Sequence, residues 1–400
     1  MNILFVWCGA VTTVMIQQLT HIASIYHRDL HYVILARSSK VTSELDQLSI
    51  PYQLLIESDF GHFFTQTNIH ETQFDRVINT SIPEFNTTIM SWAILNHCCY
   101  MDLASILASD DVIAGNVEQF KFDQQFKKKS LKAIINAWIS PGLTEILIAY
   151  VVKQYQMNPQ SITITLDENF NCLTPLFSRS PRVAIEEILT LPLWMKNGSW
   201  QIGQTCQQTT LCSTTTKYKD YIRLTQEELV SLYTWYPSLT DLQILAWWSE
   251  IEHIKFLYHV GILQDQEMLG RLLVKIPSAA SRDQITNAYR KWLIDDAGFQ
   301  AQIFIADETQ SKIITINFDW KTFKHIQETS YAGSTSISYP TGVSAAWIRY
   351  LAHITSDLDG VCNCLQLWNA TDTVIFTQLI SALIEQGIQI DITSSPLILK

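Results

Sequence analysis

Short apolar runs alternate with segments of helical periodicity over the first 135 residues, and this alternation constrains the fold more than any other feature of the chain. Six runs are rich in Val, Ile, Leu and aromatic residues; they cover residues 3–7, 32–36, 52–56, 76–79, 100–103 and 131–135. Such runs suit parallel strands that are buried on both faces. Parallel strands joined by helices need right-handed crossovers, so the pattern predicts an α/β domain with a doubly wound parallel sheet.

The pattern changes after Ser140-Pro141-Gly142. We expect a long helix over 143–155, then an α+β region with a mostly antiparallel sheet; its expected elements are strands at 162–166, 303–306 and 313–317, a hairpin at 194–200 around Asn197-Gly198, and helices over 226–262 and 281–296. The helices expected at 343–353 and 374–386, and the strand at 388–392, have the character of the first region. With 400 residues, two domains are expected. We predict a Rossmann-like domain of residues 1–140 plus 343–400, and an α+β domain of residues 141–342.

Charge and cysteine spacing exclude several classes of protein. Lys and Arg number 27 against 38 Asp and Glu, a net charge of −11, which disfavours nucleic-acid binding. The eight cysteines form no paired Cys-x-x-Cys, and Cys362-Asn363-Cys364 lacks a second pair, so we expect free thiols in a reducing cytoplasm and no metal. The apolar run at 3–16 has no preceding Lys or Arg, and no stretch of 18 apolar residues occurs, so no membrane segment is expected.

The turn after the first strand is where a dinucleotide-binding domain carries Gly-x-Gly-x-x-Gly. The three glycine positions are Trp7, Gly9 and Thr12 in this chain, so only the middle glycine is present. That glycine allows the backbone to approach a pyrophosphate, and the amides that follow it open a helix. We therefore predict a cofactor-binding turn of Gly9, Ala10 and Val11. A doubly wound domain that binds no nucleotide is the alternative.

The end of the second strand predicts which cofactor is bound. An NAD site usually places an acidic residue there, but the stretch is Ala36-Arg37-Ser38-Ser39-Lys40. Its cations and hydroxyls suit a 2′-phosphate, which favours NADP over NAD, with Arg37, Ser38 and Lys40 as ligands. The alternative is a solvated loop whose serines cap the next helix.

Several later motifs resemble one family, in a common order that covers nearly the whole chain. They are Asn79-Thr80-Ser81-Ile82-Pro83-Glu84-Phe85, Tyr100-Met101-Asp102-Leu103, Ser140-Pro141-Gly142-Leu143-Thr144 and Tyr339-Pro340-Thr341-Gly342. This set resembles the saccharopine dehydrogenase-like family. Within that family, the segments beginning at Arg182, Leu193, Tyr236 and His253 are most similar to the carboxynorspermidine (carboxyspermidine) dehydrogenases.

The resemblance implies an enzyme whose first domain and C-terminal tail bind NAD(P)H and which transfers a hydride to an imine and yields a secondary amine. It implies that the nicotinamide lies along Thr80, Ser81 and Pro83. It implies an amino-acid substrate between the domains, close to the Ser140-Pro141-Gly142 turn. Arg179 and Arg182 could pair with a substrate carboxylate, and Thr341 and Gly342 are further candidate substrate contacts. The amides that open the helix after Pro141 suit a substrate carboxylate. The second domain is also implied to form a homodimer.

Hydride transfer to a protonated imine does not strictly need a general acid, but a nearby carboxylate or histidine would help. The candidates are Asp102 at the end of the fifth strand and His253, on a helix with Glu250 on its face. Each has a structural alternative: a loop cap for Asp102, and an ordinary helical histidine for His253. For Arg179 and Arg182 the alternative is a solvated loop. Because loops at the carboxyl ends of parallel strands share one edge of a sheet, we expect Thr80, Asp102 and Ser140 on the same edge as Gly9.

The expected ligand is a small amino-acid or polyamine substrate, most closely carboxyspermidine or carboxynorspermidine. Two alternatives stay open. One is an activity of the saccharopine or lysine 6-dehydrogenase type. The other is a non-catalytic protein that binds a nucleotide or an amino acid, which the eroded glycine turn at Trp7 and Thr12 favours.

Overall fold

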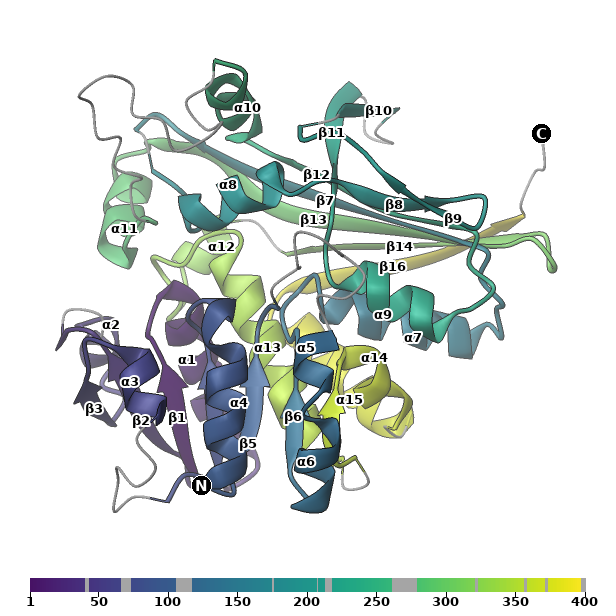
Figure 1. Ribbon diagram of the computed structural model, residues 1–400. Coiled ribbons are helices and arrows are strands. Elements are labelled where there is room, and N and C mark those ends of the chain that lie inside the picture. The colour runs from purple at the N-terminus through teal and green to yellow at the C-terminus, as the bar shows by residue number, and fades with distance from the viewer. Residues whose placement is uncertain are drawn as a thin grey trace. The chain divides into compact units, whose positions relative to one another are not determined.

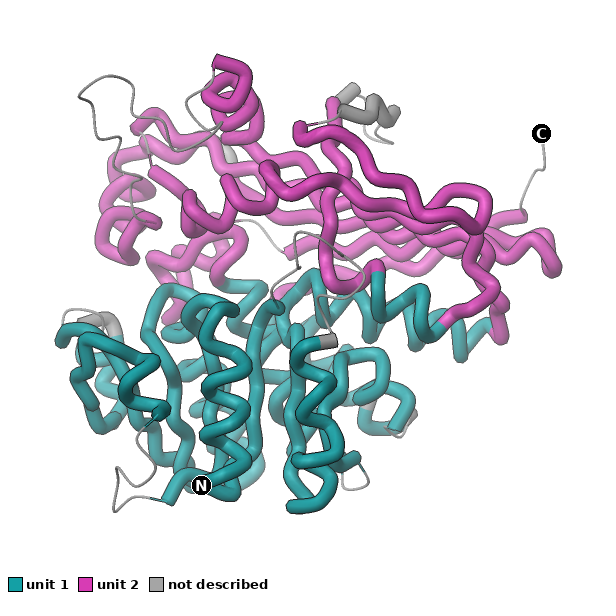
Figure 2. Tube along the Cα trace, in the orientation of Figure 1, with its two compact units in different colours: residues 1–155, 230–235, 339–386 teal, residues 156–229, 236–338, 387–400 magenta. Residues whose placement is uncertain are grey.

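Two units make up the chain in the computed structural model (Figure 2). Unit 1 holds residues 1–155, 230–235 and 339–386, and unit 2 holds residues 156–229, 236–338 and 387–400. The structure describes residues 1–39, 43–65, 73–105, 117–174, 176–206, 208–212, 218–260, 279–320, 323–355, 358–370 and 373–396. Lys40, a predicted cofactor ligand, lies outside the described residues.

A parallel sheet of seven strands is the centre of unit 1 (Figure 1). Its order is β15-β6-β5-β4-β1-β2-β3, and every neighbouring pair is parallel. The strands are β1 (Asn2–Val6), β2 (His31–Ala36), β3 (Tyr52–Ile56), β4 (Arg76–Asn79), β5 (Cys99–Asp102), β6 (Lys132–Ile134) and β15 (Gly360–Cys362). The strand order reverses between β1 and β4, which confirms the predicted doubly wound sheet. The six predicted strands are present, and β15 is an addition.

Helices cover both faces of this sheet. They are α1 (Ala10–Ile25), α2 (Ser43–Gln47), α3 (Phe60–Thr65), α4 (Asn86–Leu95), α5 (Val117–Phe120), α6 (Asp123–Lys128), α7 (Leu143–Gln154), α13 (Ser338–Ile354), α14 (Cys364–Asn369) and α15 (Thr373–Glu385), with a 3₁₀ turn η2 (Pro83–Phe85). One face packs its Val and Leu side chains against aromatic and aliphatic residues of α3, α4 and α6. The helices explain why the strands carry apolar residues on both faces.

Unit 2 is built on a nine-stranded sheet (Figure 1). Seven strands follow the order β10-β11-β12-β7-β13-β14-β16, and the hairpin β8–β9 joins it at β12. The strands are β7 (Ser161–Cys172), β8 (Leu193–Lys196), β9 (Ser199–Ile202), β10 (Gln208–Cys212), β11 (Tyr218–Leu224), β12 (Asp241–Trp248), β13 (Ile294–Asp307), β14 (Lys312–Trp320) and β16 (Ile388–Pro396). Among the strand pairs of this sheet in the described residues, only β12–β7 is parallel, so the prediction of a mostly antiparallel second sheet is confirmed.

The remaining helices are α8 (Pro181–Leu189), α9 (Glu228–Trp235), α10 (Ile251–His259), α11 (Arg282–Arg290) and α12 (Phe323–Gln327). The single helix expected over 226–262 is wrong, because β12 stands between α9 and α10. Its apolar run is compatible with either helix or strand, and pairing with β7 and β11 settles it as a strand. The helix expected over 281–296 ends at Arg290, and β13 begins at Ile294.

The C-terminal strand is the main correction to the domain assignment. We expected residues 388–392 to return to the first sheet, but β16 pairs antiparallel with β14 along its whole length in the second sheet. Residues 141–155 and 230–235 also belong to unit 1 rather than to the second domain. In the described part of the chain, no helix is both long enough and apolar enough to cross a membrane.

Candidate functional site

The turn between β1 and α1 has the extended entry that a dinucleotide loop needs, but a tryptophan lies against it. Gly9 has φ −115 and ψ −171, so its backbone is extended and unstrained. A Cβ added at Gly9 would lie 3.5 Å from Nε1 of Trp7 and would meet nothing closer. Trp7 itself has φ +79, in the left-handed region that favours glycine. The first glycine position of the motif thus keeps a glycine-like backbone while carrying an indole.

Thr12, at the third glycine position, links the loops that follow β1 and β4 by hydrogen bonds. Thr12 is 1% exposed, and its hydroxyl accepts the N–H of Gly9 at 3.4 Å. The same hydroxyl donates to Thr80 Oγ1 at 2.9 Å, and Thr80 Oγ1 lies 3.0 Å from the carbonyl of Val6, to which it donates. The N–H groups of Ala10 and Val11 open α1, where a helix has no internal partner for them. These two amides are therefore positioned to bind an anion.

Arg37 and Ser38 are exposed at the end of β2. The guanidinium of Arg37 lies 5.3 Å from the ring centroid of Phe60, which packs edge-on against Trp7 at 6.5 Å and against Phe85 at 5.8 Å. This contact holds Arg37 over an aromatic surface and leaves its charge in solvent. Whether a 2′-phosphate binds there, and hence the preference for NADP, stays a prediction.

Asn79, which sequence reasoning did not single out, organises the loop after β4. Its Oδ1 accepts the N–H and the hydroxyl of Ser81 at 3.0 and 2.6 Å. Its Nδ2 donates to the carbonyl of Ile82 at 3.1 Å and to Asn86 Oδ1 at 2.7 Å. Pro83 then begins η2. The loop that was predicted to lie along the nicotinamide is therefore fixed by a buried amide at the end of its strand.

Asp102 is the centre of a buried hydrogen-bond network rather than an accessible acid. It is 1% exposed, and Oδ1 accepts the N–H of Asn136 at 2.8 Å. Oδ2 accepts from Tyr100 Oη at 2.9 Å and from Nε2 of Gln119. Since these donors satisfy both oxygens, Asp102 acts here as a cap that joins the ends of β5 and β6. The structural alternative for Asp102 is the one that the geometry favours.

The Ser140-Pro141-Gly142 turn is closed by the chain's own backbone. The peptide bond between Ser140 and Pro141 is cis, and Gly142 has φ +123. A Cβ at Gly142 would stand 2.5 Å from the carbonyl oxygen of Trp138. The N–H of Leu143 donates to that same oxygen at 3.1 Å, and the N–H of Thr144 donates to Ile139 O at 2.9 Å. The first amides of α7 are thus engaged, which weakens the carboxylate-binding interpretation of this turn.

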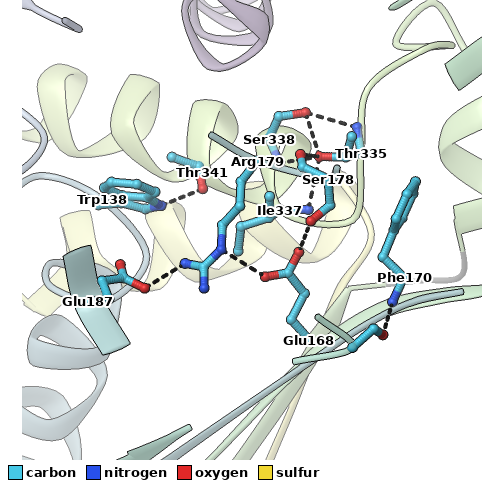
Figure 3. Close-up of polar contacts among 11 residues, drawn as sticks. Trp138, Glu168, Phe170, Ser178, Arg179, Glu187, Thr335, Ile337, Ser338 and Thr341 are labelled. Atoms are coloured by element: carbon cyan, nitrogen blue, oxygen red, sulfur yellow. Dashed lines mark hydrogen bonds and ion pairs between the residues drawn. The ribbon is translucent and has the colours of Figure 1, made fainter. Parts of the chain in front are cut away.

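Thr341 and Gly342 are also occupied by packing within unit 1. Thr341 is fully buried and accepts from Trp138 Nε1 at 2.5 Å (Figure 3). A Cβ at Gly342 would lie 2.6 Å from Cβ of Val14, so this glycine permits the close approach of α13 to α1. Neither residue presents a free group to a substrate.

The loops of unit 1 do share the predicted edge. Gly9 follows β1, Thr80 follows β4 and Asp102 ends β5, and all these strands are parallel. The backbone confirms the proximity of the loops, because the N–H of Thr80 donates to Val6 O at 3.3 Å and the N–H of Ala137 donates to Asp102 O at 3.0 Å. Whether these residues bind a cofactor stays a prediction.

Unit 2 carries a second cluster of polar groups, around Arg179 (Figure 3). Nη1 of Arg179 lies 2.8 Å from Glu187 Oε2, and Nε lies 3.5 Å from Glu168 Oε2. The guanidinium also lies 4.4 Å from the ring centroid of Trp248. Ser178 donates its hydroxyl to Glu168. Arg179 is therefore held by two carboxylates of its own unit rather than left in a solvated loop.

Two carboxyls, Glu168 of this cluster and the nearby Glu250, have pKa values that are raised toward the protonated form. Burial raises the pKa of Glu168, which is 5% exposed, against the opposing effect of Arg179. Burial and the nearby Glu168 raise the pKa of Glu250 to about 7. A carboxyl that titrates near neutrality next to a like charge is typical of functional sites, and of some structural ion networks. The sequence alone indicated Glu250 only as a neighbour of His253.

His253 and Arg182 lie apart from this cluster. His253 is exposed on α10. Arg182 is exposed and pairs with Glu186 one helical turn away, at 2.6 Å. A surface pair of this kind contributes little to stability or to a site. The structure favours the surface alternatives for both residues.

Comparison with known proteins identifies relatives of this arrangement. No family model matches the chain. Carboxyaminopropylagmatine dehydrogenase from Synechocystis sp. is 23% identical over 312 residues, which cover 76% of this chain and 74% of that protein. The resemblance to the saccharopine dehydrogenase-like family is confirmed.

A solved structure agrees in fold with this family. Apo saccharopine dehydrogenase (L-Glu forming) from Saccharomyces cerevisiae matches with a TM-score of 0.66, over 98% of this chain and 99% of that one. At 11% identity, this likeness concerns the fold alone. Both the Saccharomyces cerevisiae protein and the Synechocystis relative are dehydrogenases by name.

Proposed function

We propose that the protein is an NADP-dependent dehydrogenase that reduces an imine to a secondary amine in a carboxylated polyamine of the carboxyspermidine or carboxynorspermidine class. The observation that carries the proposal is the similarity, over three quarters of both chains, to a dehydrogenase named for a carboxyaminopropyl derivative of agmatine. Such substrates combine a carboxylate with cationic groups.

The residues of unit 1 fit a dinucleotide with one exception. Gly9 is extended and has no backbone within reach of an added Cβ, the amides of Ala10 and Val11 open α1, and Arg37 is exposed at the end of β2. The exception is Trp7, whose indole lies against Gly9 and must shift for a pyrophosphate to approach. When bound, the cofactor supplies the hydride.

The residues of the chain would then hold and orient the reactants. The Thr12–Thr80 hydroxyl pair fixes the β1 and β4 loops, and Asn79 shapes the loop that would contact the nicotinamide. In unit 2, the carboxyl oxygens of Glu168 and Glu187 lie around the single cation Arg179, and such acceptors also suit an ammonium group. Glu250, with its pKa raised to about 7, can keep a proton at neutral pH and is our candidate for maintaining a protonated imine.

The deciding experiment is a panel of NADPH oxidation assays with purified protein. Aspartate semialdehyde is offered with 1,3-diaminopropane, putrescine or agmatine, and α-ketoglutarate with lysine is the comparison for a saccharopine-type activity. We expect oxidation with one of the semialdehyde and amine pairs. Oxidation with α-ketoglutarate and lysine alone would overturn the substrate class while keeping the dehydrogenase.

Gly9→Ala makes this assay specific for the predicted loop. The added methyl group meets only the indole of Trp7 at 3.5 Å, so the fold should tolerate it, whereas a bound pyrophosphate should not. Gly298→Ala is the matched control, because a Cβ there meets nothing within 4 Å. Activity lost in both variants, or in neither, contradicts the cofactor site.

A second candidate function is a non-catalytic binding protein on the same fold. The observation that favours it is the indole of Trp7 over Gly9, at a position with φ +79. Tryptophan fluorescence during titration with NADPH and NADH distinguishes the two, with Trp7→Phe used to isolate the signal of Trp7 among the 12 tryptophans. No change with either nucleotide favours the non-catalytic protein.

A further inference from the structure

Two buried arginines lie at the amino-terminal edge of the parallel sheet in unit 1, the edge opposite the predicted cofactor loops. Arg76 is the first residue of β4 and is 5% exposed, and Arg349 is on α13 and is 2% exposed. Thr80 follows the last residue of β4, so the strand separates the two edges by about 13 Å at ~3.3 Å per residue.

The guanidinium groups of these arginines are not satisfied by the protein. Nε and Nη1 of Arg76 and Nε of Arg349 are buried and have no hydrogen-bond partner among the described residues. Nη2 of Arg349 lies 2.8 Å from the thioether Sδ of Met1, which is a weak acceptor. Buried guanidinium groups in proteins are normally paired with an anion, since desolvation of an unpaired charge costs several kcal/mol.

The surroundings add positive charge rather than remove it. Lys132 begins β6 and donates Nζ to the carbonyl of Ala352 at 2.7 Å and to the carbonyl of Thr355, at the end of α13. Burial, Arg349 and Arg76 lower the pKa of His353 to about 4, so His353 is neutral. Arg28 also contributes positive charge there.

Neighbouring acidic groups do not neutralise the pair. Asp75 is exposed, and its Oδ2 accepts the N–H of Asn2 at 2.7 Å; it forms no ion pair with Arg76 or Arg349 in the described structure. Asp359 acts on Lys132, and Tyr32, Cys98, Cys99 and Cys362 are further titratable groups that interact with these cations. Burial raises the pKa values of the Tyr32 phenol to about 12 and of the Cys362 thiol to about 12, so both stay neutral.

Deprotonation of an arginine does not relieve the charge either. Burial and the charge of Arg76 lower the pKa of Arg349 to about 9, which leaves its guanidinium protonated at neutral pH. Two like charges with unsatisfied donors thus face one region between β4 and α13, and a negative group of small size is what that region lacks.

We propose that Arg76 and Arg349 bind a small inorganic oxyanion, phosphate or sulfate, at the amino-terminal edge of the unit 1 sheet. Tetrahedral oxyanions accept several N–H donors at once, which matches the unpartnered donors of two buried guanidinium groups on neighbouring elements. The ion joins the start of β4 to the last turns of α13 and stabilises unit 1 independently of the dinucleotide.

Thermal unfolding at constant ionic strength tests the site with inorganic phosphate as the probe. In the native protein we expect Tm to rise by a few degrees and to saturate between 0 and ~50 mM phosphate, because a ligand of the folded state stabilises it by mass action. Arg349→Met should lose the saturable rise and keep an equal or higher Tm without phosphate, since it removes a buried unpaired charge. Arg290→Met, at an exposed arginine of α11, is the matched control and should behave as the native protein does.

Two results would overturn the proposal: no saturable rise in the native protein, or the same rise in Arg349→Met as in Arg290→Met. A linear rise shared by all three proteins is the general effect of excluded salts and counts against the site. Equilibrium dialysis of the native protein with radiolabelled phosphate, repeated with saturating NADPH, does not depend on any variant folding. It should give one ion per chain that NADPH does not displace; no bound ion, or an ion that NADPH displaces, refutes the proposal.

Discussion

Replacing Trp7 by glycine removes one large side chain from the predicted cofactor turn and leaves the backbone path of the turn unchanged. Trp7 has φ +79, a conformation that costs a residue with a Cβ about 1–3 kcal/mol. Its indole is partly buried and packs edge-on against Phe60 at 6.5 Å. The substitution relieves the backbone strain and removes the ring that lies 3.5 Å from the position of a Gly9 Cβ.

Relief of the backbone strain raises the free energy of unfolding, whereas loss of the packed indole lowers it. A partly buried indole contributes about 2–3 kcal/mol of burial, and an aromatic edge contact adds about 0.5–1.5 kcal/mol. Glycine also adds about 0.5–1 kcal/mol of unfolded-state entropy, against the 1–3 kcal/mol of strain that it removes. We therefore expect Trp7→Gly to lower the free energy of unfolding by about 1–3 kcal/mol.

Nucleotide affinity should change in the opposite direction. A pyrophosphate that approaches Gly9 must displace the indole and lose its contact with Phe60, at a cost of about 1 kcal/mol. Glycine at position 7 removes that cost, so NADPH should bind about fivefold more tightly, at ~1.4 kcal/mol per factor of ten. Isothermal titration calorimetry on the native protein, Trp7→Gly and Trp7→Phe measures this, because Trp7→Phe keeps both the strain and a ring. Equal or weaker NADPH binding by Trp7→Gly would refute the reasoning that the indole obstructs the turn.

Three further substitutions test other parts of the structure. Arg37→Asp should weaken NADPH about tenfold or more and favour NADH, since a charged hydrogen bond worth about 1.5–3 kcal/mol is lost; equal affinities of the native protein for both cofactors would contradict this. Gly142→Ala should cost about 2–4 kcal/mol in denaturant unfolding because its Cβ meets Trp138 O at 2.5 Å, while Gly198→Ala, also at positive φ but with nothing within 4 Å, should cost only about 1 kcal/mol. Glu250, with its pKa raised from 4.5 to about 7, binds more protons when folded, so its contribution to stability falls as pH rises from 4.5 to 7 and is constant above; Glu250→Gln should flatten that part of the pH profile, and an unchanged slope would count against the shift.

The sheet of unit 1 could be predicted because its signal is local. Each strand from β1 to β6 is a short apolar run next to a helix, so six strands are evident in the sequence. The exceptions have physical reasons. β15 is three residues long and begins at Gly360, too short to show a pattern. β16 alternates as an edge strand does, but nothing in its residues indicates which of two sheets will pair with it.

The candidate site was less predictable because its contacts join distant segments. Motif spacing identifies Gly9 and Asp102, but the partners of Asp102 come from Gln119 and Asn136, 17 and 34 residues further along the chain. Likewise, Arg179 is evident as a cation, whereas its carboxylates come from β7 and α8. The sequence identifies the chemical groups but not their hydrogen-bond partners. Those partners decide whether Asp102 caps the strand ends or is free to act in catalysis.

At the turn after β1, too, contacts and backbone conformation decide what the residues at the glycine positions do. Thr12 occupies the position where a third glycine would allow close packing. Its hydroxyl accepts the N–H of Gly9 and donates to Thr80 Oγ1, so the turn keeps its geometry. Trp7 stands where a first glycine would relieve a left-handed backbone, and the backbone adopts that conformation nonetheless. The backbone of the turn therefore keeps its path with Trp7 and Thr12 at two glycine positions of the motif. The surface that a nucleotide would contact differs at one side chain, that of Trp7. Whether this fold still binds a dinucleotide depends on the mobility of the Trp7 indole more than on the number of glycines.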